Sequence, residues 1–330
     1  MGNAEQRREA PRVALIGYGE VGRTLAEELR AGGHDVTAFD SAPETESQAM
    51  HARAHGVNLA ASPGEAVATA GLVISAVNHQ QAVAAAGACV AALPAGAFYL
   101  DLNSVSPATK QKIAELIGSA YGRFVEGALT TSLRWPVRRC SLLLGGPYAA
   151  VMAPILEKLG LSAQLCSLKP GQTSATVMCR KAMRVGLEAL VVEVFTAARH
   201  YGVEANLLAS LSEAFPAIDW ERQVTDVYQQ AIEQGRRAGE ELREAAASVR
   251  DMGLEPWSTQ ATAARADWMA DLADAGSFGT KGQAAFARSP DWRVEADRIL
   301  KLLGRRARRG AADQKNVTIS EGNAPPSTAP

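Results

Sequence analysis

Short apolar runs alternate with alanine-rich helical stretches from Val13 to about Leu168. The runs are short enough to be buried strands, and this alternation is typical of a parallel sheet that carries helices on both faces. Strands are expected at Val13–Ile16, at Val36–Phe39, and at residues 71–77, 97–102, 123–129, 140–146 and 163–168. The pattern therefore predicts an α/β fold, a doubly wound parallel sheet, over residues 11–169.

After Pro170 and Gly171 the pattern changes to long stretches with helical periodicity. Helices are expected at residues 173–201, 204–215, 221–252, 258–275 and 291–303, and no convincing strand follows residue 170. The second part of the chain is therefore predicted to be an all-α domain over residues 170–303. The flanking residues 1–10 and 304–330 are polar or contain few large apolar side chains, so both are expected to be disordered.

The first strand ends in the glycine-rich sequence GYGEVG at residues 17–22, and a helix-like stretch follows it. Each glycine has a separate task in a dinucleotide-binding turn. Gly17 permits the tight turn, Gly19 lets the backbone approach a pyrophosphate, and Gly22 lets the helix pack close to the strand. The N-terminus of the helix then offers N–H groups and a positive dipole end to the phosphates. These parts together predict a Rossmann domain that binds a nicotinamide dinucleotide.

The second strand ends in Asp40, 18 residues after Gly22. A carboxylate there accepts hydrogen bonds from the ribose hydroxyls and repels a 2′-phosphate, so NAD is the expected cofactor, with NADP as the other possibility. Val77 and Asn78 follow a later strand and either line the cofactor or form a plain turn. The expected cofactor-binding residues are Gly17, Tyr18, Gly19, Glu20, Val21, Gly22, Asp40, Val77 and Asn78.

Asn103 and Ser104 follow the strand predicted at residues 97–102, at the sheet edge where open α/β folds bind ligands. Small amide and hydroxyl side chains hold a carboxylate or hydroxyl without adding charge, so both are candidates for substrate contact. Ser106 before Pro107 also suits the N-cap and first position of a helix. The two interpretations are compatible, because Ser106 can cap the helix while Asn103 and Ser104 face the ligand.

Composition and charge argue against several classes of partner and site. The 330 residues are 47% hydrophobic and 21% charged with a net charge of −1, so there is no electrostatic case for a nucleic-acid or membrane partner. No apolar run reaches membrane-spanning length, and residues 1–10 lack the apolar core of a signal peptide, which predicts a cytoplasmic protein. The four cysteines lack metal-ligand spacing and are expected to be buried free thiols. No His/Asp/Glu cluster at ligand spacing stands out, so no metal site is expected.

The chain resembles the β-hydroxyacid dehydrogenase family, the relatives of 6-phosphogluconate and 3-hydroxyisobutyrate dehydrogenases, in a branch with its own helical C-terminal domain. The resemblance spans residues 12 to 300 and is carried by GYGEVG with Asp40, by DLNSVSP at 101–107, by FVEGA at 124–128, by the helix led by Gly171, and by residues 243–253 before Leu254-Glu255-Pro256. It implies an NAD(P)-dependent oxidoreductase acting on a small hydroxy acid, keto acid or related carbonyl compound. With the long apolar helix Ala175 to Ala198, it also implies a homodimer through the C-terminal helices.

The chain departs from the family at the proton-transfer residue. The family's lysine, six residues after the leading glycine, falls at Val177, and its supporting asparagine falls at Lys181. Lys181 lies on the same helix face as Val177, about 6 Å further along the axis. One hypothesis is that Lys181 replaces the missing lysine, with its pKa lowered by burial and by Arg184. The alternative is that Lys181 belongs to a solvated or dimer-facing basic stripe.

Two further departures leave the reaction open. The family's Lys-Asp pair falls at Glu240–Glu241. The family also has a Gly-Gly pair after the strand that matches residues 124–128, and residues 130–132 stand in its place here. Thr131 and Ser132 are therefore expected to contact the substrate in place of the backbone. Acidic residues at 240 and 241 suit an amine, an iminium or a polyol better than a carboxylate; the alternative is that they form a solvated helix face. Reduction of an imine on the same scaffold is thus one alternative function, and a non-catalytic cofactor-binding protein is another.

Overall fold

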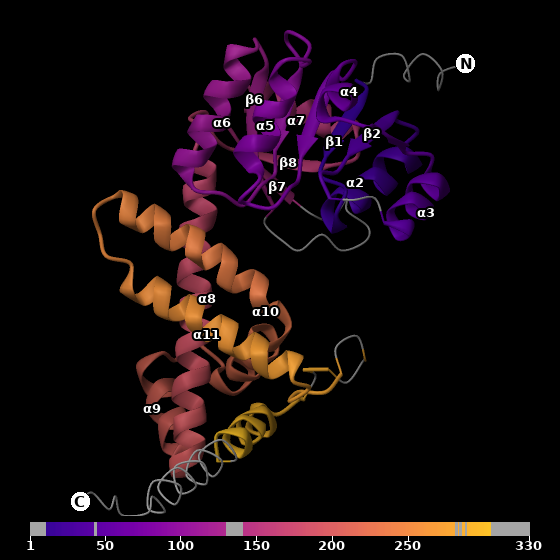
Figure 1. The fold of residues 1–330 in the computed structure, drawn as a ribbon. Helices are drawn as coiled ribbons and strands as arrows, with labels where there is room; N and C mark the ends of the chain where they lie inside the picture. Colours follow the sequence, from indigo (N-terminus) through magenta and orange to yellow (C-terminus); the bar gives the residue numbers. More distant parts are fainter. Residues whose placement is uncertain are drawn as a thin grey trace, which may run out of the picture. The chain divides into compact units, whose positions relative to one another are not determined.

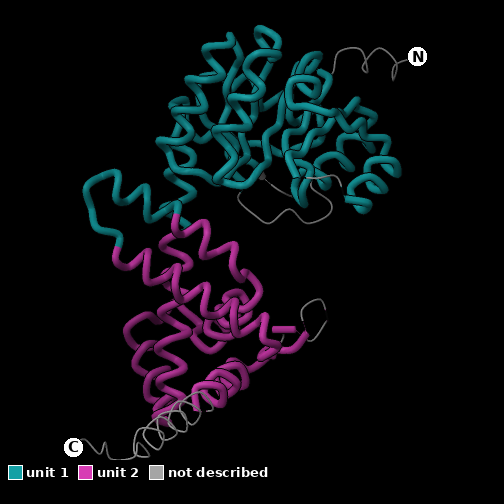
Figure 2. The backbone as a smooth tube through the Cα atoms, in the orientation of Figure 1, with its two compact units in different colours: residues 1–181, 244–256 teal, residues 182–243, 257–330 magenta. Residues whose placement is uncertain are grey.

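The computed structural model describes residues 11–42, 45–129, 141–280, 283, 286–287 and 289–304. The chain divides into two compact units (Figure 2). The first comprises residues 1–181 and 244–256, and the second comprises residues 182–243 and 257–330. Of the segments expected to be disordered, 1–10 and 304–330, residues 1–10 and 305–330 lie outside the described residues, whereas Gly304 belongs to the last helix, contrary to that expectation.

The first unit contains an eight-stranded sheet in the order β3-β2-β1-β4-β5-β6-β7-β8. The strands are β1 (Val13–Ile16), β2 (Val36–Phe39), β3 (Asn58–Leu59), β4 (Leu72–Ser75), β5 (Phe98–Asp101), β6 (Arg123–Leu129), β7 (Ser141–Gly145) and β8 (Ser162–Ser167). The first six pair in parallel, in the order 3-2-1-4-5-6 of a doubly wound dinucleotide-binding sheet. The predicted fold class is confirmed.

The sheet is not parallel throughout. Strand β7 pairs with β6 in antiparallel register, Glu126 opposite Gly145, and β8 then pairs in parallel with β7. The segment 130–140 between β6 and β7 is shorter than the crossover that a parallel pair needs, which accounts for the reversal. Strand β3 has only two residues, too short for an apolar pattern to reveal it.

Helices cover both faces of this sheet (Figure 1). Because side chains alternate along a strand, Val13 and Leu15 enter one apolar core while Ala14 and Ile16 enter the other. The first core takes side chains from α2 (Glu20–Ala31), α3 (Glu46–His55) and α7 (Ala149–Lys158). The second takes side chains from α4 (Pro63–Val67), α5 (Ala82–Val90) and α6 (Pro107–Ser119). The two cores hold the carboxyl ends of β1, β2, β4 and β5 at one edge.

The second unit is helical and draws on α8 (Gln172–Tyr201), α9 (Glu204–Ala214), α10 (Trp220–Asp251), α11 (Trp257–Asp274) and the helical residues 292–304. Its core centres on aromatic side chains. Trp292 packs edge-on against Phe195, with ring centroids 5.2 Å apart, and stacks on Tyr228 at 6.0 Å. All three are buried, so this cluster joins α8, α10 and the last helix.

Helix α10 differs from the single helix predicted over residues 221–252. Gly235 has φ 54° and ψ −146°, which interrupts the helix near its middle. A backbone with positive φ costs glycine little and most other residues much more, so the kink forms at the position where glycine occurs. Periodicity continues on both sides of the kink, which is why the sequence pattern did not reveal it.

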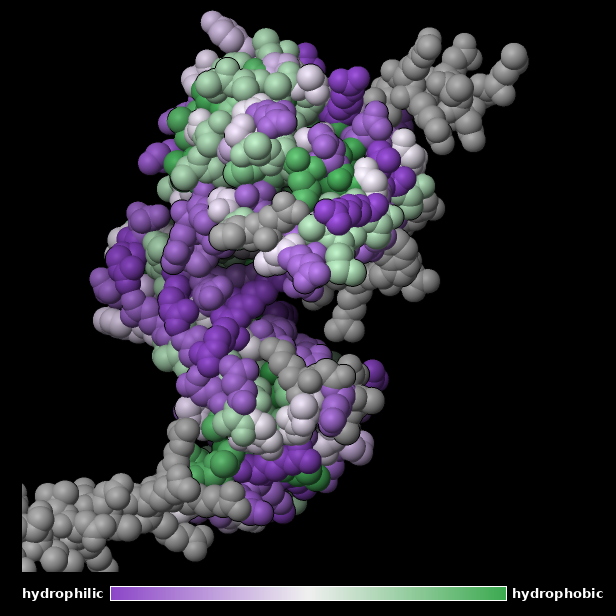
Figure 3. All heavy atoms as spheres, turned by 45° about the vertical axis from the view of Figure 1, so that its right-hand side comes forward, coloured by the Kyte–Doolittle hydropathy of each residue, from purple (hydrophilic) through white to green (hydrophobic). Residues whose placement is uncertain are grey.

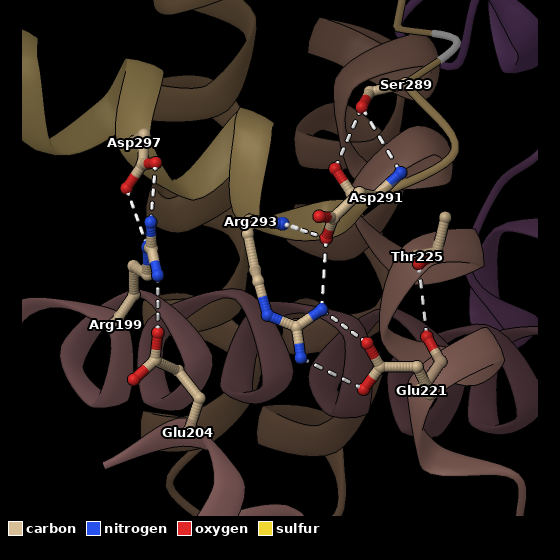
Figure 4. A network of polar contacts seen from close by, with 8 residues as sticks. All are labelled: Arg199, Glu204, Glu221, Thr225, Ser289, Asp291, Arg293 and Asp297. Atoms are coloured by element: carbon tan, nitrogen blue, oxygen red, sulfur yellow. Dashed lines mark hydrogen bonds and ion pairs between the residues drawn. The ribbon is translucent and has the colours of Figure 1, made fainter. Parts of the chain in front are cut away.

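Arginine ion pairs join the helices of the second unit (Figure 4). Arg199 of α8 pairs with Glu204 of α9 at 2.7 Å and with Asp297 of the last helix at 2.8 Å. The hydrogen bonds from Arg199 hold the pKa of the Asp297 carboxyl below its usual value. Arg293 pairs with Glu221 at the start of α10 in the same way. These pairs are partly exposed, so each contributes modestly to stability.

Hydrophobic residues on the face seen in Figure 3 occur in several separate patches among hydrophilic ones. Of the helices within the described ranges, none combines the length and apolar character that a membrane crossing requires.

The prediction of buried thiols is right for Cys89, where burial raises the pKa of the thiol to about 12, and wrong for Cys166 and Cys179, which are exposed. Cys166 lies on the edge strand β8, where Gln164 and Leu165 are exposed as well. Cys140 lies outside the described residues.

Candidate functional site

The glycine-rich turn between β1 and α2 has the geometry that its spacing predicts. Gly17 has φ +102°, and a Cβ there would lie 2.3 Å from the carbonyl oxygen of Ala76. A Cβ at Gly22 would lie 2.0 Å from the carbonyl oxygen of Gly17. By contrast, a Cβ at Gly19 would meet no atom of the protein within 4 Å. Gly17 and Gly22 are therefore required by the fold, and Gly19 borders open space.

The start of α2 also fits an anionic ligand. Gly19 is its N-cap and supplies no side-chain cap, whereas Thr45, Ser62 and Ser106 cap α3, α4 and α6 with their hydroxyls. The first N–H groups of a helix point outward and have no partner within the helix. Open space beside uncapped N–H groups suits a pyrophosphate, with exposed Glu20 and half-buried Val21 as the first helical residues.

Asp40 lies at the carboxyl end of β2 beside this turn. Its carboxylate accepts hydrogen bonds from the backbone N–H of Tyr18 at 2.7 Å and of Ala42 at 2.9 Å. These two bonds fix the position of the side chain. Each carboxylate oxygen retains a second lone pair that can accept from a ribose hydroxyl. The turn and the acid that the sequence paired are thus in direct contact.

Asn103 connects the loops that follow β4 and β5. Its Oδ1 accepts from the Val77 backbone N–H at 2.7 Å, and its Nδ2 donates to the Ser75 hydroxyl at 3.0 Å. The side chain is buried, so its bonds hold the Val77 loop in place, while the adjacent Ser104 is exposed. Exposed Asn78 accepts from the Gln81 N–H at 3.0 Å, which closes the turn before α5. Ser106 caps α6 with Pro107 in its first turn, as expected.

A buried ion pair under this loop was not predicted from the sequence. Lys110 of α6 is fully buried, and its Nζ lies 2.9 Å from the Asp101 carbonyl oxygen and 3.3 Å from its carboxylate. The same carboxylate accepts from the Asn103 backbone N–H at 2.9 Å. Lys110 and Asp101 therefore fix the start of the Asn103–Ser104 loop. A lysine on the helix after the loop was the available signal, but charged residues on a helix usually face solvent.

Glu126 is the second buried acid that the sequence did not assign. Its carboxylate accepts from the backbone N–H groups of Gly171 at 2.9 Å and Thr173 at 2.7 Å, and from the Ser174 hydroxyl at 3.3 Å. The charge thus sits at the N-terminus of α8, where the helix dipole favours an anion. Gly145 leaves room for it, because a Cβ there would lie 2.3 Å from a carboxylate oxygen. Glu126 positions the first turns of α8 against the sheet.

Those first turns carry the candidate for proton transfer. Val177 and Lys181 are both half-buried in the first unit. Arg184, expected to act on Lys181, pairs with Glu188 and donates to Gln234 at 3.1 Å, so its charge is offset by a neighbouring carboxylate. Thr131 and Ser132, the other candidates for substrate contact, lie outside the described residues.

Of the two acids at 240 and 241 on α10, Glu241 forms an ion pair within the protein. Glu241 accepts from the Arg237 guanidinium at 3.1 Å, one turn earlier on α10, and Glu240 is exposed. An acid already paired with an arginine is a weaker partner for a cationic substrate. The charge at 240–241 therefore gives only modest support to an amine or iminium ligand.

Comparison with known proteins identifies the family. The model of the NAD binding domain of 6-phosphogluconate dehydrogenase matches residues 12–166. A protein of Methanothermus fervidus, described as "Uncharacterized 28.5 kDa protein in 7S RNA 5'region", is 30% identical over 205 residues, 61% of this chain and 76% of that protein. The chain belongs to the β-hydroxyacid dehydrogenase family. Members of this family are NAD(P)-dependent dehydrogenases and reductases, so the chain is an NAD(P)-dependent oxidoreductase.

Other relatives place the chain within the β-hydroxyacid dehydrogenases. The probable 3-hydroxyisobutyrate dehydrogenase of Mycobacterium tuberculosis is 27% identical over 209 residues, 59% of this chain and 67% of that protein. A conserved hypothetical protein from Sinorhizobium meliloti has a similar crystal structure, with a TM-score of 0.74 and 27% identity over 90% of this chain and 98% of that one. Residues 198–269 match a domain of unknown function (DUF1932). The predicted branch, with its own helical C-terminal domain, is confirmed.

Proposed function

We propose that the protein transfers a hydride between NAD and a small hydroxy acid or keto acid. This proposal rests on one observation: three features lie at one edge of the first unit's sheet. These are the open, uncapped turn at Gly19, the carboxylate of Asp40, and the Asn103–Ser104 loop, whose start is fixed by the hydrogen bond from Lys110 to the Asp101 carbonyl oxygen. The first two suit a dinucleotide with an unmodified ribose, and the loop offers an uncharged hydroxyl to a substrate carboxylate.

The bound nicotinamide would supply or accept the hydride. The chain's own residues have three other tasks. Ser104 donates a hydrogen bond to the substrate, and Asn103 positions the Val77 loop. Lys181 holds and moves the proton at the substrate oxygen, as a general acid in reduction and a general base in oxidation.

The reaction class is tested by following NADH oxidation with a panel of small keto acids and a panel of cyclic imines. Turnover of keto acids is the expected result. Turnover of imines alone would establish the alternative of imine reduction, which the loss of the family's lysine at Val177 favours, since an iminium carbon needs no proton at oxygen. Tight NADH binding without turnover of either panel would leave a non-catalytic cofactor-binding protein.

Lys181→Met is expected to lower kcat for a keto acid by about 10²–10⁴-fold, because a general acid at the oxygen contributes about that much. The alkaline limb of the pH–rate profile is expected to disappear as well. The measurement is steady-state NADH oxidation at saturating substrate across pH. Arg180→Met removes a neighbouring exposed cation and is the matched control. It should leave kcat and the alkaline limb of the pH–rate profile unchanged. Unchanged turnover by Lys181→Met would remove Lys181 from the mechanism.

Asp40→Asn is expected to reduce the preference for NADH over NADPH by about tenfold to a hundredfold, or about 1.4–2.8 kcal/mol. The amide oxygen still accepts one backbone N–H, while the charge that repels a 2′-phosphate is gone. Dissociation constants of both cofactors follow from fluorescence titration and require no substrate. Asp35→Asn, at an 80% exposed side chain before the same strand, is the control. Equal binding of NADH and NADPH by the unaltered protein would contradict the assignment.

We further infer that two copies associate through α8. Its exposed apolar side chains recur at spacings of four and three residues, which places them on one face. They are Met183 (67% exposed), Leu187 (53%), Leu190 (57%) and Val194 (38%). Light scattering is expected to give twice the 34.7 kDa chain mass, and Leu187→Asp should halve it. Leu254→Asp, at a similarly exposed leucine outside α8, should leave the measured mass unchanged. A monomeric unaltered protein would refute the inference.

A further inference from the structure

Three potential metal ligands meet between α2 and α3, outside the residues assigned above to cofactor and substrate. Glu27 extends from α2, and His51 and His55 extend from α3. His51 Nε2 lies 2.8 Å from Glu27 Oε1, and His55 Nε2 lies 3.7 Å from the same oxygen. One ligand atom from each residue lies within 4.8 Å of the other two. The two imidazole rings stack with centroids 4.6 Å apart.

These residue types and spacings match the needs of a zinc ion. His51 and His55 are four residues apart on one helix, so both rings project from the same face. Imidazole nitrogens and a carboxylate oxygen bind Zn²⁺ at about 2.0–2.2 Å, which puts pairs of tetrahedral ligands about 3.3–3.6 Å apart. The separations of 2.8 and 3.7 Å lie on either side of that value, so small side-chain rotations suffice. Two histidines with one carboxylate leave a fourth position for water.

Tyr18 supplies the outer contact that metal-bound histidines usually have. Its buried hydroxyl lies 2.8 Å from His51 Nδ1, the ring nitrogen that faces away from Glu27. A hydroxyl oxygen at this place can accept a hydrogen bond from Nδ1–H in the tautomer whose Nε2 binds a metal, and it holds the ring's orientation.

We propose that Glu27, His51 and His55 form a zinc-binding site in which Tyr18 orients His51. Glu27 and His51 have side chains 30% and 16% exposed, and His55 is 38% exposed, so an ion can enter from solvent at the His55 side. The site links α2 to α3. It also reaches the cofactor turn through Tyr18, whose backbone N–H donates to Asp40. A metal at this position therefore stabilises the first unit and the turn together.

The experiment titrates chelator-treated, untagged full-length protein with ZnCl₂ by calorimetry and records the thermal midpoint with and without zinc. The expected result is one equivalent per chain and a rise in the midpoint of thermal unfolding, because a ligand that binds only the folded state stabilises it. His55→Gln and His51→Gln should each weaken binding at least about 100-fold, and Tyr18→Phe about tenfold. His200→Gln, at an exposed histidine elsewhere, is the matched control and should bind like the unaltered protein.

The exposed thiols of Cys166 and Cys179 are other potential zinc ligands. The double variant Cys166→Ser, Cys179→Ser should bind zinc unchanged. Loss of binding in that variant with retention in His55→Gln would overturn the proposal. So would the absence of binding by the unaltered protein up to about 0.1 mM ZnCl₂. Circular dichroism of each variant separates a lost ligand from a lost fold.

Discussion

A methyl group added at Gly19 is expected to leave the fold intact and to weaken NADH binding by about tenfold to a hundredfold, or about 1.4–2.8 kcal/mol. Gly19 has φ −77° and ψ −155°, a conformation open to alanine, and its Cβ would meet no protein atom within 4 Å. The same open space is where the backbone of a dinucleotide turn approaches the pyrophosphate. Gly19→Ala therefore places a methyl group against the ligand and not against the protein.

Gly22→Ala, three residues later in the same turn, is expected to disturb the fold itself and not the space for the ligand. Its Cβ would lie 2.0 Å from the Gly17 carbonyl oxygen, so strand and helix must separate. Overpacking of this kind costs about 1–3 kcal/mol or more in the free energy of unfolding. The loss of NADH binding by Gly22→Ala should accordingly follow the loss of folded protein.

The two variants are compared by their thermal midpoints and by NADH fluorescence titration of the folded fraction. Gly19→Ala should lower its thermal midpoint by no more than about 2–4 °C, because alanine in place of glycine at an N-cap costs about 1 kcal/mol or less. Normal NADH affinity in a stable Gly19→Ala protein would show that the pyrophosphate does not bind at this turn.

Glu126→Ala is expected to lower the free energy of unfolding by about 3–5 kcal/mol, because it leaves two buried N–H groups at the start of α8 without an acceptor. Both the Gly171 and Thr173 N–H groups bond only to this carboxylate among the contacts described. The carboxylate also neutralises the positive end of the helix dipole, and that contribution is lost with it.

Glu126→Gln separates the two contributions. Its amide oxygen can accept one N–H, but its NH₂ group then faces the other N–H, so an intermediate loss of stability is expected. Glu115→Ala removes an exposed acid from α6 and is the matched control. The measurement is the urea midpoint of each purified variant. Stability of Glu126→Ala within about 1 kcal/mol of the unaltered protein would show that water replaces the carboxylate.

Glu126 has a second consequence for activity. It anchors the first turns of α8, where Val177 and Lys181 lie. A shift of this helix start by about 1 Å can cost about a hundredfold in rate. The Glu126→Gln protein, assayed where it is fully folded, should therefore lose more kcat than NADH affinity.

The parts of this protein that the sequence revealed depend on neighbouring residues. The glycine spacing at 17, 19 and 22 predicted the turn, because its φ value and its two close approaches involve the turn itself and the strand beside it. Ser106 before Pro107 predicted the start of α6 for the same reason, since a cap bonds only three residues onward. The geometry of the glycine-rich turn and the start of α6 could thus be predicted from neighbouring residues, while the contacts of the turn with a cofactor stay predictions.

The parts that the sequence did not reveal depend on residues far apart in the chain. Glu126 bonds across 45 to 48 residues, Asn103 across 26, and His51 meets Glu27 across 24. Neither periodicity nor spacing identifies such partners, because each pair arises from the order of strands in the sheet and the packing of helices on it. The cofactor was therefore determined by the sequence alone, through local backbone geometry. The anchoring of α8, the support of the substrate loop and the histidine cluster were decided only by the tertiary structure, through contacts that form once the sheet has assembled.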